Sequence, residues 1–125
     1  MALRDDICLA MEEHIMSAPP WSMISAGELS HALDAKEKVL LLDVREPSEY
    51  DDGRISGAVN IPAGQLSARA EELPKDRAAR IVTYCATGRR SAYATMFLRV
   101  YGYNDVRTLT GGIREWTSAG YPVEE

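Results

Sequence analysis

The chain contains few of the residues on which disulfide frameworks and metal centres depend. Its 125 residues include two cysteines, Cys8 and Cys85, and two histidines, His14 and His31. Two cysteines so far apart indicate a reducing compartment rather than a disulfide framework, and these spacings match no zinc-binding pattern. A chain of this length also buries enough apolar surface to fold without such a staple. We therefore expect neither a metal site nor a disulfide.

Positive charge and long apolar runs are also scarce. Fourteen basic residues stand against nineteen acidic ones, which gives a net charge of −5. This balance argues against nucleic acids and anionic membranes as partners. The N-terminal region carries acidic residues at positions 5, 6, 12 and 13 and has no apolar run long enough for a signal peptide or a membrane span. These features predict a cytoplasmic protein.

Short apolar runs instead alternate with helical patterns along most of the chain. The pattern predicts strands over 39–44, 81–84 and 106–109, an extended segment over 57–62, and helices that start at 25, 66, 91 and 113. Strands that lack polar alternation and are separated by helices are typical of parallel sheets. The sequence therefore predicts an α/β fold, with a mostly parallel central sheet and helices on both faces.

The N-terminal segment has a separate pattern. Leu3, Ile7, Met11 and Ile15 recur at a spacing of four, and two prolines follow at 19 and 20. This spacing predicts an amphipathic helix over 3–17 that ends before the prolines. We therefore divide the chain into an N-terminal helical extension, residues 1–20, and one domain, residues 21–125.

Cys85 stands between a predicted strand and a predicted helix. The intervening segment, Cys-Ala-Thr-Gly-Arg-Arg over 85–90, is short, contains glycine and carries two positive charges. Backbone amides, the dipole of the following helix and the two arginines would all favour the thiolate form of Cys85. A cysteine at a strand end is by itself more often an inert core residue. The arginines favour a reactive thiol, at the sheet edge where α/β proteins bind ligands.

Three segments resemble the signatures of the single-domain rhodaneses, a family of sulfurtransferases. Residues 43–50 and 53–62 resemble the first signature, Cys85-Ala-Thr-Gly-Arg-Arg-Ser resembles the active-site loop, and 109–116, with its glycine pair and tryptophan, resembles the closing segment. The matches lie within residues 25–122. Arg54 stands where the family often has histidine. The resemblance implies a rhodanese-like fold for the domain over 21–125.

The resemblance also implies an activity, that of a sulfurtransferase of the thiosulfate:cyanide type. Sulfane sulfur would move from a small anionic donor, thiosulfate or a persulfide, to a thiophilic acceptor, cyanide or a thiol, through a persulfide on Cys85. The resemblance is also compatible with a protein partner that passes sulfur to or from this chain in a sulfur relay. No metal or organic cofactor is required. Because neither histidine lies in a matched segment, the thiol would be activated by the loop rather than by a Cys-His pair.

The remaining site residues follow from the same resemblance. The loop amides would cradle the outer sulfur, and Arg90 would brace the loop or meet the donor while Arg89 points outward; this substrate-binding loop comprises Ala86, Thr87, Gly88, Arg89, Arg90 and Ser91. Asp43 and Arg45 resemble family positions near the active site. An ion pair that simply fixes the chain explains these two residues equally well.

Two other functions fit a cysteine on this fold. Cysteine phosphatases and arsenate reductases share it, but their loops hold five residues between cysteine and arginine, which would require arginine at position 91, where the chain has Ser91. The second alternative is a rhodanese-like module that binds a partner or carries sulfur without catalysis. Non-catalytic modules of this kind usually lose the cysteine, and this chain retains Cys85.

Overall fold

The computed structural model describes residues 23–125. The helix predicted over 3–17, the domain boundary at residue 20, Cys8 and His14 lie outside the described residues. The described elements, in chain order, are β1 (Met23–Ile24), α2 (Ala26–Asp34), β2 (Leu40–Asp43), α3 (Pro47–Asp52), β3 (Val59–Asn60), the 3₁₀ turns η2 (Ala63–Gln65) and η3 (Ala70–Glu72), β4 (Arg80–Tyr84), α4 (Arg89–Val100), β5 (Asp105–Leu109) and α5 (Gly112–Ser118).

The strands form one parallel sheet in the order β1-β5-β4-β2-β3. The α/β prediction is confirmed, and the predicted strands near 40, 81 and 106 pair side by side at its centre. The two-residue strand β1 was not predicted. It lies at the sheet edge, where Met23 pairs with Thr108, and is too short to show a periodic pattern.

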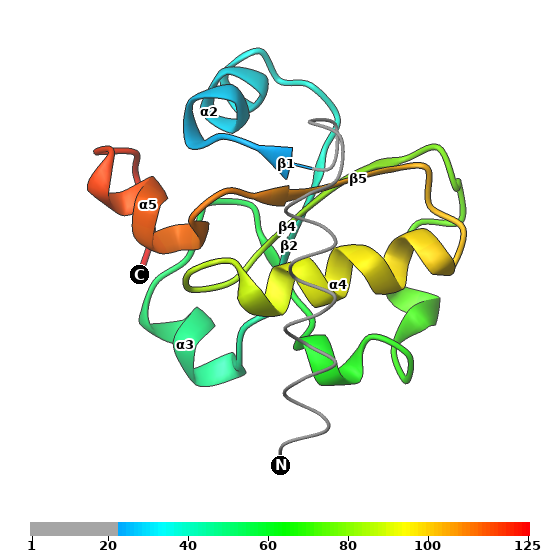
Figure 1. Ribbon diagram of the computed structural model, residues 1–125. Coiled ribbons are helices and arrows are strands. Elements are labelled where there is room, and N and C mark those ends of the chain that lie inside the picture. The colour runs from blue at the N-terminus through cyan, green and yellow to red at the C-terminus, as the bar shows by residue number, and fades with distance from the viewer. Residues whose placement is uncertain (1–22) are drawn as a thin grey trace.

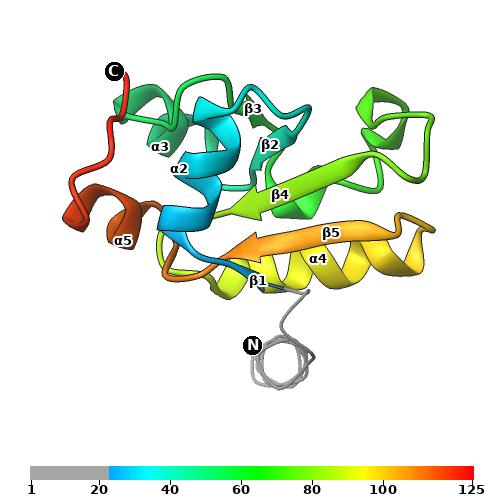
Figure 2. The same ribbon diagram turned by 90° about the horizontal axis from the view of Figure 1, so that it is seen from above.

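Helices cover both faces of the sheet (Figure 1), as the sequence predicts. One face packs against α4 and the 3₁₀ turns, with Leu42, Ile81, Leu98 and Val106 in its core. The other face packs against α2 and α5, with Leu29, Leu41, Val82, Leu109 and Trp116 in its core. Seen from above, α2 and α4 lie on opposite sides of β5 (Figure 2). Both faces of each central strand are therefore buried, which explains the absence of polar alternation.

Two of the predicted helices, the one that starts at residue 25 and the one over 66–73, have different outcomes. The start of α2 is confirmed, because Ser25 and Glu28 form a reciprocal capping box. The single helix predicted over 66–73 is wrong. The 3₁₀ turn η2 ends before this segment, residues 66–69 form an irregular turn, and η3 follows; Arg69 lies outside helical geometry at φ −116° and ψ 26°. Leu66 and Leu73 still insert into the core, so their apolar side chains reflect burial rather than helical periodicity.

The carboxyl ends of the strands lie together with α3, α5 and the segment that leads into α4 (Figure 1). In a parallel sheet this edge receives the loops that follow each strand. Asp43, the last residue of β2, and Cys85, the residue after β4, therefore both lie at the carboxyl ends of the strands. Among residues 23–125, no helix has the length and apolarity needed to cross a membrane.

Candidate active site

The segment between β4 and α4 forms a tight loop around Cys85. β4 ends at Tyr84, and Gly88 caps α4 with φ +121°, a backbone angle that favours glycine. α4 begins at Arg89, two residues before the start predicted at Ser91. Arg89 and Arg90 therefore lie in the first helical turn, and the loop proper is Cys85 to Gly88.

The Cys85 thiol is nearly enclosed and has two polar neighbours. Its side chain is buried with 1% exposure. The backbone N–H of Gly88 donates to Sγ at 3.0 Å, and the hydroxyl oxygen of Ser91 lies 3.6 Å from Sγ. A backbone amide that points at sulfur stabilises negative charge on it. The structure thus brings Cys85, Gly88 and Ser91 together around one sulfur atom.

The start of α5 holds the other side of this loop. The backbone N–H groups of Ile113 and Arg114 donate to the carbonyl oxygens of Cys85 and Ala86 at 2.9 and 3.1 Å. Gly112 makes this contact possible, because a Cβ atom there would lie 2.5 Å from the Cys85 oxygen. These bonds turn two loop carbonyls toward α5, so that the carbonyls do not face the sulfur.

Arg90 is held by an ion pair with α3. Its Nη1 and Nη2 donate to the two carboxylate oxygens of Glu49 at 2.6 and 3.0 Å. These bonds lower the pKa of Glu49 to about 2, against the opposing effect of partial burial. The same bonds raise the pKa of Arg90, and the nearby Cys85 adds to that rise. Both side chains are therefore charged at neutral pH.

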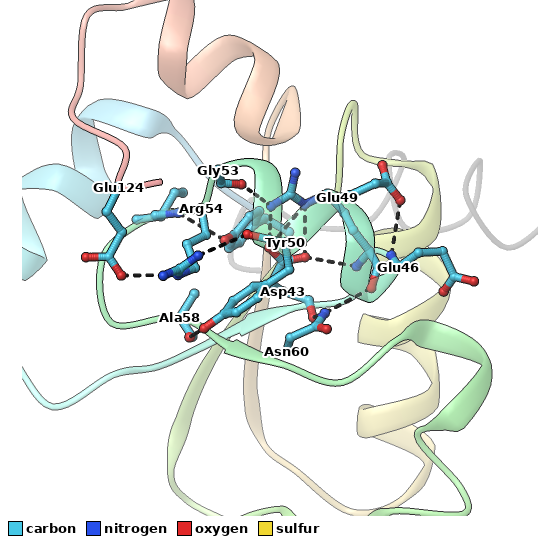
Figure 3. A network of polar contacts seen from close by, with 12 residues as sticks. Asp43, Glu46, Glu49, Tyr50, Gly53, Arg54, Ala58, Asn60 and Glu124 are labelled. Atoms are coloured by element: carbon cyan, nitrogen blue, oxygen red, sulfur yellow. Dashed lines mark hydrogen bonds and ion pairs between the residues drawn. The ribbon is translucent and has the colours of Figure 1, made fainter.

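Asp43 and Arg45 form a buried ion pair at the end of β2. Arg45 donates from Nε and Nη2 to the Asp43 carboxylate at 2.6–3.1 Å, and its Nη2 also donates to the Gly53 carbonyl at 2.6 Å. Burial would lower the pKa of Arg45, but the bonds and charge of Asp43 raise it. The Asn60 amide donates to the Asp43 and Arg45 carbonyls (Figure 3). The pair therefore fixes the segment that leads into α3.

The sequence patterns missed three residues that shape this site. Glu49 lies in α3, a six-residue helix too short to show periodicity, although it belongs to the segment that resembles the first signature. Gly112 was noted as part of the glycine pair in the closing segment and not as a neighbour of Cys85, and Thr108, a strand residue whose hydroxyl oxygen lies 2.7 Å from that of Ser91, gave no signal. Among the described residues, no group of His, Cys, Asp and Glu side chains could hold a metal ion.

Comparisons with known proteins identify the family of this chain. The family model described as the rhodanese-like domain matches residues 25–119. A protein named sulfurtransferase from Allochromatium vinosum is 40% identical over 100 residues, which cover 80% of this chain and 92% of the relative. Other curated relatives are longer, and the chain spans 30% and 50% of the length of two of them.

Two solved structures illustrate the range of similar proteins. A thiosulfate sulfurtransferase from Pseudomonas aeruginosa is 34% identical with a TM-score of 0.76, and the match covers 82% of this chain and 20% of that one. A protein of unknown function from Rhodopseudomonas palustris, titled a possible tyrosine phosphatase, is 27% identical with a TM-score of 0.79, over 94% and 93% of the two chains. The family model covers most of the chain, and the chain belongs to the rhodanese-like domain family.

Proposed function

We propose that the protein is a sulfurtransferase that carries sulfane sulfur as a persulfide on Cys85. The observation that carries this proposal is the 3.0 Å hydrogen bond from the Gly88 amide to Sγ, in a loop whose following turn supplies the Arg90 cation. This arrangement favours negative charge on a sulfur atom. The sulfurtransferase names of similar proteins support the same reaction class.

The first half-reaction loads the cysteine. The Cys85 thiolate attacks the outer sulfur of thiosulfate, a sulfur–sulfur bond forms, and the original sulfur–sulfur bond breaks as sulfite leaves with its electron pair. One negative charge on Cys85 and two on thiosulfate become one on the persulfide and two on sulfite. A persulfide donor would react in the same way and leave as a thiolate.

The second half-reaction removes the outer sulfur from the Cys85 persulfide. Cyanide or a thiolate attacks the outer sulfur, and the Cys85 thiolate is released as the leaving group. Because Sγ itself is nearly buried, the outer sulfur, about 2 Å further along the bond, is the atom that an acceptor meets. The mechanism needs a reduced Cys85, so we place the protein in a reducing compartment such as the cytoplasm.

A phosphatase is the second candidate, favoured by the structural likeness to the protein titled a possible tyrosine phosphatase. The chain places four residues between Cys85 and Arg90, and Arg90 is already paired with Glu49. A phosphate has to be surrounded by the loop amides and to receive the arginine. The short loop and the engaged arginine therefore favour sulfur transfer.

Mass spectrometry of the intact protein tests the proposal. Incubation with thiosulfate should add one sulfur atom, and cyanide should remove it as thiocyanate. Cys85→Ser should show neither change, and Cys8→Ser should behave like the parent because Cys8 lies outside the matched family segment. Normal turnover by Cys85→Ser would refute the mechanism.

A further inference from the structure

Two hydrogen-bonded pairs of buried hydroxyl groups lie at and next to Ser91, the residue that contacts the Cys85 sulfur. The Ser91 hydroxyl oxygen is 2.7 Å from Thr108 Oγ1, 3.1 Å from the Gly88 carbonyl oxygen and 3.6 Å from Cys85 Sγ. Ser91 and Thr108 are 0% and 3% exposed. A separate contact joins Thr83 Oγ1 to Thr95 Oγ1 at 2.8 Å, and Thr83 donates to the Ser91 carbonyl. Ser91 is the hydroxyl residue of this group that touches the sulfur.

Counting hydrogens fixes the direction of these bonds. Within residues 23–125, the Thr108 hydroxyl has one hydrogen-bonding neighbour, Ser91 Oγ. A buried hydroxyl donates its hydrogen wherever an acceptor is in reach, so Thr108 donates to Ser91. The single hydrogen of Ser91 is then left for the Gly88 carbonyl or for Sγ.

The protonation state of Cys85 decides between these two acceptors. A thiol donates its own hydrogen to Ser91 Oγ, and Ser91 then donates to the Gly88 carbonyl. A thiolate has no hydrogen and carries a full charge, which makes it the stronger acceptor. In the persulfide the charge moves to the outer sulfur, so Ser91 returns to the Gly88 carbonyl.

We propose that Ser91 is a catalytic hydrogen-bond donor that turns to Sγ when Cys85 is a thiolate and away from it when Cys85 carries hydrogen or sulfur. This inference rests on the proposed sulfur transfer. The thiolate is the leaving group when the acceptor takes the outer sulfur, and a donor that engages only then lowers the barrier of that step. Ser91 therefore acts mainly in the discharge of the persulfide.

The charged groups near the sulfur do not compete with this role. Arg90 of α4 faces Cys85, and Glu49 of α3 lies behind it; the Asp43–Arg45 pair follows β2, and Arg114 reaches the loop from α5 through its backbone. The pKa of Glu49 is lowered to about 2, and those of Arg90 and Arg45 are raised. None of these three groups changes charge between pH 5 and about pH 10, the range in which thiols titrate.

Ser91→Ala tests the proposal through two measurements. The first is the rate of iodoacetamide alkylation against pH, whose midpoint should move upward by about one pH unit. The second is single-turnover discharge of the loaded persulfide by cyanide, which should slow about tenfold. Loading by thiosulfate, measured above both alkylation midpoints, should change by less than about threefold, since the cysteine is then already a thiolate.

Two further variants make the result decisive. Thr95→Val removes a buried hydroxyl from the same region that touches Thr83 and not the sulfur, and both measurements should match the parent. Ser91→Ala with Thr108→Val removes both members of the bonded pair, leaves no hydroxyl unpaired, and should reproduce the Ser91→Ala shifts even where the single variant folds poorly.

The outcomes separate this inference from the sulfurtransferase proposal. Alkylation needs no sulfur donor, so a shifted midpoint in a protein that forms no thiocyanate would refute sulfur transfer and retain the hydrogen bond. Alkylation curves that superimpose for the parent and the Ser91 variants, or an equal shift in Thr95→Val, would overturn the role of Ser91.

Discussion

Arg90 of α4 and Glu49 of α3 are joined by two parallel hydrogen bonds, 2.6 and 3.0 Å long, across 41 residues of sequence. The cation that closes the cysteine loop is thus partly neutralised by a carboxylate on another helix. The pair ties α3 to the start of α4, and it also limits how strongly Arg90 stabilises charge on Cys85. Removing Arg90 and removing Glu49 should therefore have opposite effects on the reactivity of the Cys85 thiol.

Arg90→Ala removes the cation next to the sulfur and should slow alkylation of Cys85 by iodoacetamide at neutral pH. Glu49→Gln leaves the cation without its counter-charge and should speed alkylation. We expect about fivefold in each direction, the effect of roughly 1 kcal/mol. The measurement is the alkylation rate against pH for both variants and the parent.

Arg80→Ala is the matched control for these variants. Arg80 is the first residue of β4 and lies at the amino ends of the strands, opposite the end that carries Cys85. It pairs with Glu37 and Asp105. Its loss should leave the alkylation curve unchanged. Curves for Arg90→Ala that superimpose on the parent would show that the loop amides activate the thiol without the arginine.

The same ion pair predicts how stability depends on pH. The pKa of Glu49 falls from 4.5 to about 2 on folding, so the charged form is stabilised in the folded state. Its contribution is complete above pH 4.5 and is lost as the pH falls toward about 2. Because both side chains are about one-third exposed, we expect less than about 1 kcal/mol.

Denaturant unfolding of the parent and Glu49→Gln measures this contribution. The difference in unfolding free energy should be present at pH 6 and should shrink between pH 4.5 and about pH 2.5. Asp51→Asn removes a carboxylate from the same helix that makes no ion pair among the described residues, and should show no such trend. A difference that stays constant with pH would mean that Glu49 acts without its charge.

Sequence patterns predicted the central strands, and with them the loop that follows β4, because buried strands have apolar residues at consecutive positions. Leu41, Leu42, Ile81, Val82 and Val106 are buried in the sheet, and such strands need apolar residues at consecutive positions. The capping box at Ser25 and Glu28 was equally visible, because it depends on residues three positions apart.

The parts that could not be predicted depend on contacts between distant segments. No pattern near Glu49 shows that it meets Arg90, and no pattern near Thr108 shows that it meets Ser91. A turn over 66–69 and the 3₁₀ turn at 70–72 replace the helix predicted over 66–73, because the apolar residues of this segment follow the core surface rather than a helical repeat.

Gly112→Ala should disrupt the cysteine loop. A methyl group at this position would lie 2.5 Å from the Cys85 carbonyl oxygen and 2.6 Å from that of Ala86, at φ +62°. The contact with α5 must then open, and we expect sulfur transfer to fall at least about tenfold with a destabilisation of roughly 1–3 kcal/mol. Thiocyanate formation per cysteine and denaturant unfolding measure the two effects.

Gly64→Ala is the control for that substitution. Gly64 has no atom within 4 Å of the added methyl group and has no positive φ. Both the turnover and the unfolding free energy should stay within error of the parent. Full turnover by Gly112→Ala would show that the loop keeps its shape without the close contact to α5.

Removal of residues 1–20 should leave the chemistry intact. The family model begins at residue 25, and the described site is built from residues of that segment. Turnover per active site should change by less than about twofold, because every group proposed to act on sulfur is retained. Loss of turnover in a truncated protein that still shows the parent's circular dichroism would assign the extension a part in the active site.

Loop length separates sulfur transfer from phosphate hydrolysis. With four residues between Cys85 and Arg90, the loop directs the Gly88 amide at one sulfur atom, whereas we expect a fifth residue to widen the loop toward a tetrahedral oxyanion. The parent should form thiocyanate and should not hydrolyse p-nitrophenyl phosphate.

One glycine inserted after Gly88 should reduce thiocyanate formation at least about tenfold, since the Gly88 amide then no longer points at Sγ. The same glycine inserted after Lys36, in the exposed turn between α2 and β2, should leave sulfur transfer unchanged. Phosphate hydrolysis by the parent that depends on Cys85, without thiocyanate formation, would replace the sulfurtransferase assignment with the phosphatase one.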